Sequence, residues 1–383
     1  MRILYFSRAY TPHDRRFLAA LAASPHEIYY LRLEDDRVRY EIRPPPEGIR
    51  ELSPLGGGPP LLLPENWLPL APKLKALLDQ LQPDLVHAGP IQSCALLVAL
   101  AGFHPLLAMS WGSDLLVDAD RGPFWSWMTC HALAHADLLV TDCAEVSFKA
   151  RRLAGLPPDR IVQFPWGVDL AQFPSARHPA GKVAISLRSW EPNYGILHLL
   201  EGFRLAHNDD PELRLWLLGD GSLRPEVERF LACHRLNDAV ELAGAVSPGD
   251  MPEHLASADI YVSCAASDGA SISLLEAMAT GLPAIVTDRP SNREWVEDGV
   301  HGRLVPFGNA RAIAHALCEM SALSPDQRRE MACRNRAVVE QRADWQRNVR
   351  KLLAAYRRLC HDKRRASPIG ALEPGFCVNH DTG

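Results

Sequence analysis

Several features that mark other protein classes are missing from this sequence, and each absence narrows the function. The nine cysteines form no Cys-x-x-Cys pair, so reduced thiols fit better than a disulfide framework. The fifteen histidines show no His-Glu-x-x-His spacing, which predicts no metal site. The formal net charge is −5, which argues against a nucleic-acid partner because nucleic-acid binders are usually basic.

Long apolar runs are also missing. The most apolar stretch, residues 94–109, is interrupted by His104 and Pro105 and is shorter than the about 20 residues that cross a bilayer. The chain opens on a strand-like run at residues 2–6, so we expect no signal peptide. These observations predict a cytoplasmic protein, with weak attachment to the inner face of the membrane as an open alternative.

What the sequence does contain is a regular alternation of short apolar runs with helical patterns. Its 383 residues exceed one ordinary core and suit two domains. Strands are predicted at residues 3–6, 28–33, 85–87, 106–110, 138–141, 161–164, 183–187, 213–218, 240–242, 260–263, 284–287 and 303–305. Helices are predicted at residues 15–23, 73–81, 124–135, 224–234 and 310–320. This alternation is typical of βαβ units around a parallel sheet.

The alternation breaks once, in the Pro- and Gly-rich segment 164–182, which we interpret as a linker. We therefore predict an N-terminal domain at 1–170 and a C-terminal domain at 171–342. Residues 44–64 are predicted to form a loop, and residues 361–383 a disordered tail. Two doubly wound, Rossmann-like α/β domains would face a central cleft, with ligand-binding loops at the carboxyl ends of the strands.

The segment 343–360 is predicted to be an amphipathic helix. Its apolar stripe consists of Trp345, Val349, Leu352, Leu353, Tyr356 and Leu359. Such a helix needs a partner surface, and we expect it to pack back on the N-terminal domain. Packing on the C-terminal domain alone remains an alternative, as does a membrane-facing helix.

The most informative segment is residues 267–283, which read SDGASISLLEAMATGLP. Asp268 leads into small residues that open a helix, and Glu276 follows on that helix; the small-residue loop and helix start comprise Gly269, Ala270, Ser271 and Ile272. Free N–H groups at a helix N-terminus suit a diphosphate, and carboxylates accept paired hydrogen bonds from sugar hydroxyls. The pattern favours a nucleotide-sugar pocket; the alternative is a capping Asp268 with a solvated Glu276.

This segment resembles the signature of the group 1 glycosyltransferases, the retaining family 4 with the GT-B fold. The signature is an acidic residue, a Gly-rich loop, and a Glu followed by Ala-Met-Ala-x-Gly-x-Pro. Further similarity lies at residues 83–87, 164–169, 217–221, 240–246, 257–262, 292–296 and 299–305. The resemblance covers residues 1 to about 355 and is weakest in the first 80 residues.

The resemblance implies an enzyme that moves a hexose-type sugar from a nucleotide-diphospho-sugar to an acceptor hydroxyl of a glycan, a lipid-linked molecule or a small molecule. Asp268 would hold hydroxyls of the donor sugar, Glu276 the ribose, and the loop the diphosphate. The other donor-binding positions are Gly219, Gly244, Ala245 and Val246. The first acidic position is usually Glu, so Asp268 is one methylene shorter. No cofactor and no metal are implied, because cations and amides neutralise the leaving group.

Arg188 follows the strand predicted at 183–187. The family has Arg here and a Lys about five residues further on, both of which neutralise the diphosphate. This chain has Asn193 and Tyr194 where that Lys would fall. The resemblance therefore implies a catalytic Arg188, with a surface arginine as the alternative. The missing Lys leaves open a catalytically impaired nucleotide-sugar binder.

Candidates for contacting the acceptor stand at strand ends of the N-terminal domain: Arg8, Asp14, His87 and Asp114. The family's Gly-Gly pair after the first strand is absent, and Trp111 stands where relatives carry His. Asp14 and Asp114 have alternatives as a helix cap and a turn cap. An isolated histidine such as His87 is more often structural.

Two other enzyme classes remain to be weighed. A nucleotide-sugar epimerase or hydrolase on the same fold would need an acid–base constellation that the sequence does not show. No carboxylate pair of the glycosidase type can be placed either. A nicotinamide-dependent dehydrogenase is disfavoured because no Gly-x-Gly-x-x-Gly follows the first strand.

Overall fold

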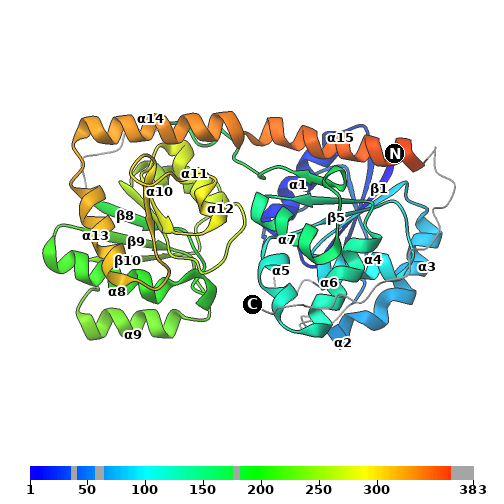
Figure 1. Cartoon of the computed structure of the whole chain (residues 1–383), viewed down its shortest axis with the longest axis horizontal. Helices are drawn as coiled ribbons and strands as arrows, with labels where there is room; N and C mark the ends of the chain where they lie inside the picture. The colour runs from blue at the N-terminus through cyan, green and yellow to red at the C-terminus, as the bar shows by residue number, and fades with distance from the viewer. Residues whose placement is uncertain (36–40, 57–63, 176–181, 364–383) are drawn as a thin grey trace. The chain divides into compact units, whose positions relative to one another are not determined.

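The computed structural model describes residues 1–35, 41–56, 64–175 and 182–363, which form two compact units (Figure 1). Unit 1 contains Met1–Phe164 and the described chain from Val349 onward, and unit 2 contains Pro165–Asn348. The first division therefore falls between residues 164 and 165, where the sequence predicted 170 and 171. Most of the predicted tail, from residue 364 onward, lies outside the described residues.

Unit 1 is built on a seven-stranded parallel sheet in the order β3-β2-β1-β4-β5-β6-β7. Its strands are β1 (Arg2–Ser7), β2 (Glu27–Arg32), β3 (Ile49–Glu51), β4 (Leu85–Ala88), β5 (Leu106–Met109), β6 (Leu138–Thr141) and β7 (Ile161–Gln163). Its longer helices are α1 (Pro12–Ala22), α3 (Ala71–Leu81), α6 (Pro123–His135) and α7 (Ala144–Ala154). Shorter helical segments are α2 (Pro64–Trp67), η1 (Leu68–Leu70), η2 (Ile91–Ala95), α4 (Leu96–Leu100), α5 (Ser113–Leu116), η3 (Asp118–Asp120) and η4 (Pro158–Arg160).

Strand β3 corrects one prediction. Residues 44–64 were expected to form a loop, but Ile49–Glu51 pairs with β2 as a parallel edge strand, with Ile49 opposite Ile28. The prediction was wrong because three residues are too few to show an alternating pattern. The Pro- and Gly-rich neighbours on both sides also read as a turn. Residues 57–63 of this segment lie outside the described chain.

The last described helix, α15 (Trp345–Lys363), starts in unit 2 and continues in unit 1 from Val349. Its apolar stripe is buried, including Leu352 and Tyr356, except for the half-buried Leu353. The Tyr356 hydroxyl lies 2.6 Å from Nδ1 of His87 on β4. The C-terminal helix is thus part of the core of unit 1.

Unit 2 is built on a six-stranded parallel sheet in the order β10-β9-β8-β11-β12-β13. Its strands are β8 (Val183–Ser186), β9 (Arg214–Leu218), β10 (Val240–Gly244), β11 (Ile260–Ser263), β12 (Ala284–Thr287) and β13 (Gly302–Val305). Its helices are η5 (Pro192–Tyr194), α8 (Ile196–Asp209), α9 (Arg224–His234), α10 (Met251–Ala256), α11 (Ile272–Thr280), α12 (Pro290–Arg293), α13 (Ala310–Ser321) and α14 (Pro325–Arg342). The strand order reverses between β8 and β11, and such a switch point is where α/β sheets bind ligands.

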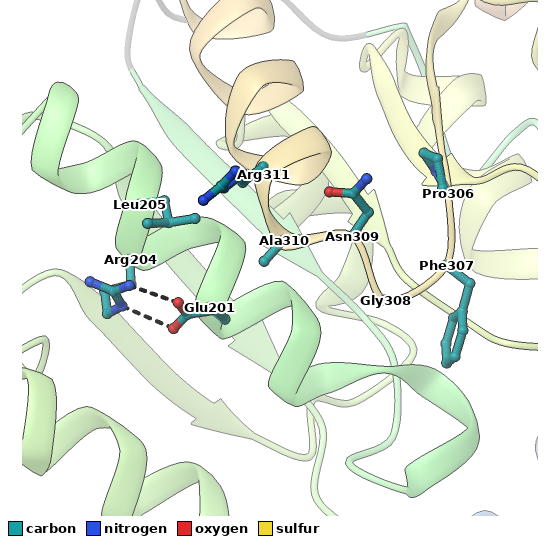
Figure 2. A pocket seen from close by; sticks show the side chains of 9 residues that line it. All are labelled: Glu201, Arg204, Leu205, Pro306, Phe307, Gly308, Asn309, Ala310 and Arg311. Carbon is teal, nitrogen blue, oxygen red and sulfur yellow. Dashed lines mark hydrogen bonds and ion pairs between the residues drawn. The ribbon is translucent and has the colours of Figure 1, made fainter.

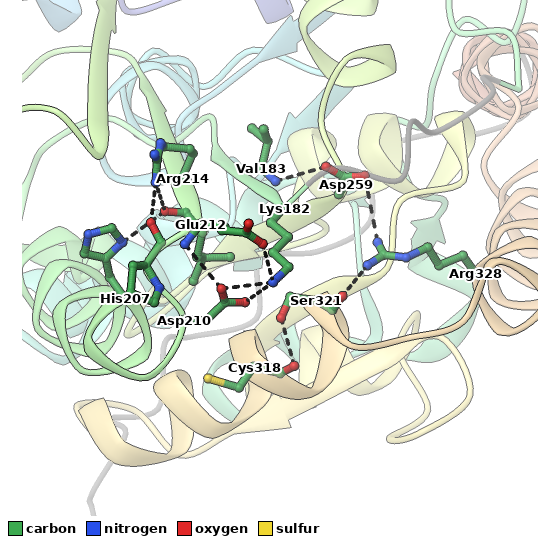
Figure 3. Close-up of polar contacts among 12 residues, drawn as sticks. Lys182, Val183, His207, Asp210, Glu212, Arg214, Asp259, Cys318, Ser321 and Arg328 are labelled. Carbon is green, nitrogen blue, oxygen red and sulfur yellow. Dashed lines mark hydrogen bonds and ion pairs between the residues drawn. The ribbon is translucent and has the colours of Figure 1, made fainter.

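Asp259, at the entry to β11, explains why an Ala-Asp pair precedes this strand (Figure 3). Its buried carboxylate accepts a hydrogen bond from the Val183 N–H at 2.9 Å. The Arg328 guanidinium lies 3.9 Å from the other carboxylate oxygen and donates to the Ser321 carbonyl at 2.7 Å. Asp259 therefore fixes the start of β8, the strand that leads to Arg188, and links it to α14.

Candidate functional site at the switch point of unit 2

Arg188 and Asp268 meet at the carboxyl edge of the unit 2 sheet. Arg188 follows β8 and Asp268 follows β11, and these strands are neighbours. Because the ends of parallel strands share one edge, residues distant in sequence come together there. Arg188 Nη2 lies 2.9 Å from Asp268 Oδ2, with 11% and 22% of the two side chains exposed.

Two hydroxyls complete the contacts along the guanidinium edge. Arg188 Nη1 donates to Ser271 Oγ at 2.9 Å and to Ser273 Oγ at 3.2 Å. Burial opposes the charged form of Arg188, but Asp268, Tyr261 and Tyr194 together outweigh it, so the pKa of Arg188 is raised above its ordinary value. The buried Nε of Arg188 finds no hydrogen-bond acceptor among the described residues. The guanidinium therefore carries a charge whose hydrogen-bonding capacity is not filled by the described residues.

Helix α11 begins beside this cluster without a side-chain cap. Its N-cap residue is Ser271, whose side chain caps no N–H of the first turn and instead accepts from Arg188. Helix α13 differs, because its N-cap Asn309 accepts from the Ala312 N–H at 3.0 Å. The first turn of α11 therefore keeps N–H donors, and the helix dipole adds partial positive charge. This arrangement suits a phosphate or diphosphate.

The predicted donor-side glycines shape the same edge. Gly219 follows β9 with φ +129°, and a Cβ there would lie 2.9 Å from the Arg188 carbonyl oxygen. Its N–H donates to the Gly244 carbonyl at 2.6 Å, at the end of β10. Ala245 is exposed and Val246 half-buried just beyond that strand. Glu276 is half-buried on α11, four positions after Ile272.

The structure also shows a surface groove elsewhere on unit 2 (Figure 2). Its volume is about 600 Å³, and it is lined by α8 and the segment 306–311 that leads into α13. None of the predicted site residues lines it. Of its three charged side chains, Arg204 and Glu201 pair with each other at 2.7 Å, and Arg311 also lines the groove. Asn309 caps α13.

The structure places Asp14, an acceptor-side candidate, inside unit 1. It is the third residue of α1 and forms a capping box with Thr11. The Tyr5 hydroxyl donates to its carboxylate at 3.0 Å. Burial raises the pKa of Asp14 to about 6, although these hydrogen bonds lower it. The helix-cap alternative accounts for these contacts, and an acceptor contact stays a prediction.

Asp114 is likewise buried, at the start of α5. Its carboxylate accepts from the N–H groups of Ile91, Trp111 and Leu115 at 2.9–3.2 Å. It also accepts from the Ser110 hydroxyl at 2.6 Å. Asp114 therefore ties the loop after β5 to the start of η2, as the turn-cap alternative describes.

The remaining acceptor-side candidates differ in exposure. His87 is fully buried between the Tyr356 hydroxyl and Met109 Sδ, 3.2 Å from its Nε2, and burial lowers its pKa to about 3. Arg8 is partly exposed and pairs with Glu34 at 2.7 Å. Among these four candidates, Arg8 is the side chain that reaches the surface of unit 1.

Four residues around Arg188 were not among the predicted site residues: Asn193, Tyr194, Tyr261 and Ser273. Tyr261 lies on β11, and its hydroxyl is 2.8 Å from Ser273 Oγ. Ser271 and Ser273 are two positions apart at the start of α11. The sequence alone does not show that both contact Arg188, because that depends on the fold. In the sequence, Asn193 and Tyr194 stood out only as replacements for a lysine.

In the described ranges, no helix combines the length and apolar character needed to cross a bilayer. Among the same residues, no three His, Cys, Asp or Glu side chains gather as metal ligands would.

Comparison with known proteins identifies the family. The model of glycosyl transferases group 1 matches residues 169–338, and the glycosyl transferase 4-like model matches residues 2–143. The chain therefore belongs to the group 1, family 4 glycosyltransferases and has their two-domain GT-B fold.

Individual relatives are more distant. The putative colanic acid biosynthesis glycosyltransferase WcaL of Salmonella typhimurium is 29% identical over 196 residues, 49% of this chain and 48% of WcaL. The phosphatidyl-myo-inositol mannosyltransferase of Mycobacterium tuberculosis is 32% identical over 211 residues, 51% and 53% of the two chains. The chain spans about half the length of the curated relatives it matches. Anabaena HepE, solved with UDP, has a TM-score of 0.74 at 17% identity over 94% of this chain and 100% of HepE, which shows the fold alone.

Proposed function

We propose that this protein is a retaining glycosyltransferase that moves a hexose-type sugar from a nucleotide-diphospho-sugar to an acceptor hydroxyl. The observation that carries the proposal is the Arg188–Asp268 pair beside the uncapped N-terminus of α11. A cation, free N–H groups and a carboxylate at one switch point suit a diphosphate joined to a sugar. The UDP bound to HepE and the colanic acid role of WcaL support a nucleotide-sugar donor and a carbohydrate acceptor.

The proposed reaction begins with departure of the nucleotide diphosphate. Arg188 and the N–H groups of Gly269, Ala270 and Ser271 stabilise the charge that develops on the leaving group. The acceptor hydroxyl attacks the anomeric carbon from the same face, and the departing phosphate oxygen takes its proton. Asp268 holds hydroxyls of the donor sugar and shares the guanidinium with the phosphate, which is feasible because arginine has five N–H donors. Glu276 holds the ribose.

A pair of substitutions tests the donor site. Asp268→Asn should lower the affinity for a nucleotide-sugar while sparing that for the free nucleotide diphosphate, because only the former carries the hydroxyls of a donor sugar. Glu276→Ala should lower the affinity for both ligands, because both contain the ribose. Calorimetry with UDP, GDP and their glucose and mannose conjugates measures the difference. Asp288→Asn, at a half-buried carboxylate of the same unit, is the control. Equal loss of affinity for UDP or GDP in both test variants would contradict the assignment.

Two further points belong to the proposal. We expect turnover to persist in excess chelator, because Arg188 and the α11 amides supply the positive charge; complete loss, restored by manganese or magnesium, would contradict this. We also expect a cytoplasmic enzyme acting on a glycan or lipid-linked acceptor.

A catalytically impaired nucleotide-sugar binder is the second candidate, and the observation that favours it is Asn193 and Tyr194 in place of the second cation. Incubation of radiolabelled donors with an acceptor panel separates the two functions. Transfer of label supports the enzyme, whereas tight donor binding without transfer supports the binder.

A further inference from the structure

The turn that replaces the family's lysine makes a direct contact with Arg188. The guanidinium carbon of Arg188 lies 4.2 Å from the ring centroid of Tyr194, well within the range of a cation–π contact. Asp268, Ser271 and Ser273 contact the guanidinium nitrogens, and the guanidinium carbon lies over the Tyr194 ring. The arginine is therefore restrained by polar contacts and by an aromatic ring.

The same turn is fastened to the segment that leads to Asp268. The Ala266 N–H donates to the Asn193 carbonyl at 2.7 Å, and Asn193 Nδ2 donates to the Ser267 carbonyl at 2.8 Å. Gly195 closes the turn with φ +63°, and a Cβ there would lie 2.2 Å from the Cys264 carbonyl oxygen. Only glycine permits this approach. The residues that hold Tyr194 in place thus also hold the loop of Asp268.

Tyr194 cannot neutralise a phosphate as a lysine would, so its contribution has to pass through Arg188. A free arginine side chain has many rotamers, and ordering it costs free energy. A cation that is already fixed stabilises a developing negative charge without reorganisation during the reaction. We propose that Tyr194 is a positioning residue that pre-orients Arg188 toward the diphosphate, and that this pre-orientation stands in for the missing second cation. The inference rests on the proposed function, because it assigns Arg188 to the leaving group.

Turnover by Tyr194 variants tests the proposal. Tyr194→Phe keeps the ring and should retain kcat within about 2-fold, whereas Tyr194→Leu loses the cation–π contact and should lower kcat roughly 10-fold. The KM for the donor should change less than kcat, because the contact acts on the leaving group. Phe307→Leu is the matched control, since Phe307 also lies under an arginine of unit 2, with the Arg289 guanidinium carbon 5.7 Å from its ring centroid.

A double-mutant cycle separates positioning from a structural effect. In an Arg188→Ala background, Tyr194→Leu should cause no further loss, because the group it positions is gone. An equal 10-fold loss in both backgrounds would overturn the proposal. So would full kcat in Tyr194→Leu, or the same loss in Tyr194→Phe as in Tyr194→Leu.

Measurements of nucleotide binding test the role of Tyr194 even if the protein is not an enzyme. Absence of turnover in the unmodified protein with every donor would refute the enzyme but not the role of Tyr194. In that case UDP and GDP are compared with UMP and GMP by calorimetry. Tyr194→Leu should lower the affinity for the diphosphates several-fold more than the affinity for the monophosphates. An equal loss of affinity for the two sets would overturn the positioning role.

Discussion

The two units place carboxylates at equivalent points, just beyond the ends of parallel strands, and use them differently. In unit 1, Asp14 and Asp114 are 0% and 2% exposed and accept hydrogen bonds from their own loops and from neighbouring segments. In unit 2, Asp268 stays partly exposed and pairs with Arg188, whose Nε has no acceptor in the described part of the chain. The two carboxylates of unit 1 thus hold loops in place, whereas Asp268 and its partner Arg188 in unit 2 leave charge available for a ligand.

The contrast teaches that position in an α/β fold does not by itself make a functional residue. An aspartate after a strand and before a helix reads the same in both halves of the sequence. What separates them is the number of internal hydrogen bonds, since a buried carboxylate with four donors has no need of a ligand. Four substitutions or groups of substitutions test this contrast, and each affects either ligand chemistry or stability.

The largest effect is expected at Arg188. Arg188→Ala removes the cation from the proposed leaving-group site and should lower turnover by about 100- to 1,000-fold. Steady-state kinetics with the donor found by screening measures the change. The control is Arg293→Ala, at an exposed arginine paired with Asp288, which should retain activity. Retained turnover in Arg188→Ala would show that the Arg188–Asp268 pair of unit 2 does not serve a ligand.

Asp114→Ala should act on stability instead. It leaves three buried N–H groups without an acceptor, which lowers the free energy of unfolding by about 2–4 kcal/mol. Denaturant unfolding measures this, and calorimetry should show unchanged affinity for UDP or GDP. Asp159→Ala, at an exposed carboxylate of unit 1, serves as the reference. If Asp114→Ala left the stability unchanged but abolished turnover, Asp114 would instead be assigned a contact with the acceptor.

The pH dependence of stability tests the buried groups of unit 1. Burial lowers the pKa of His87 from 6.5 to about 3, so the unfolded chain binds a proton below pH 6.5 that the folded unit does not. Stability from this group is lost as pH falls, by about 1.4 kcal/mol per unit. Burial raises the pKa of Asp14 from 3.8 to about 6, so stability from Asp14 increases as pH falls between these values.

The two slopes should cancel between about pH 4 and 6, and single variants should expose each one. His87→Gln leaves the Asp14 contribution, so its free energy of unfolding should rise as pH falls. Asp14→Asn leaves the His87 contribution, so its free energy of unfolding should fall. Denaturant unfolding at several pH values measures both slopes. Parallel profiles in the two variants would show that neither group titrates as its burial requires.

The smallest effect is expected at Tyr356. Tyr356→Phe removes the hydroxyl that lies against His87 and leaves a buried ring nitrogen without that partner, which costs about 1–2 kcal/mol of unfolding free energy. Tyr29→Phe, whose hydroxyl bonds Glu27 near the surface, should cost less. Thermal and denaturant unfolding compare the two variants, and equal losses would argue against the His87–Tyr356 contact as a core interaction.

Much of the fold was readable from the sequence. Each of the twelve predicted strands has a counterpart in the structure, because strands buried in a parallel sheet are continuous apolar runs bounded by turn residues. Strand β3 was missed because it has three residues and lies at the sheet edge. Helix α1 starts at Pro12 rather than residue 15, since the capping box at Thr11 sets its first turn.

The site was readable only in part. The motif located Asp268 and the start of α11, and the strand end located Arg188, but nothing in the sequence showed that the two side chains pair. The contact depends on β8 and β11 being neighbours. Tyr194 was missed for a related reason, because a ring beneath a guanidinium is a three-dimensional relation between residues six positions apart. The family pattern recorded only that a lysine was absent.

Helix α15 has a consequence for how this chain is made. Unit 2 is one continuous stretch of residues 165–348, whereas unit 1 needs residues from both ends of the described chain. Tyr356 follows its partner His87 by 269 residues, so translation at about 5–20 residues per second separates the two by roughly 15 to 50 s. During that interval the nascent sheet of unit 1 lacks its final helix and exposes apolar surface to chaperones or to misassembly, while unit 2 is completed on the ribosome. The domain that is synthesised first is the one whose folding finishes last.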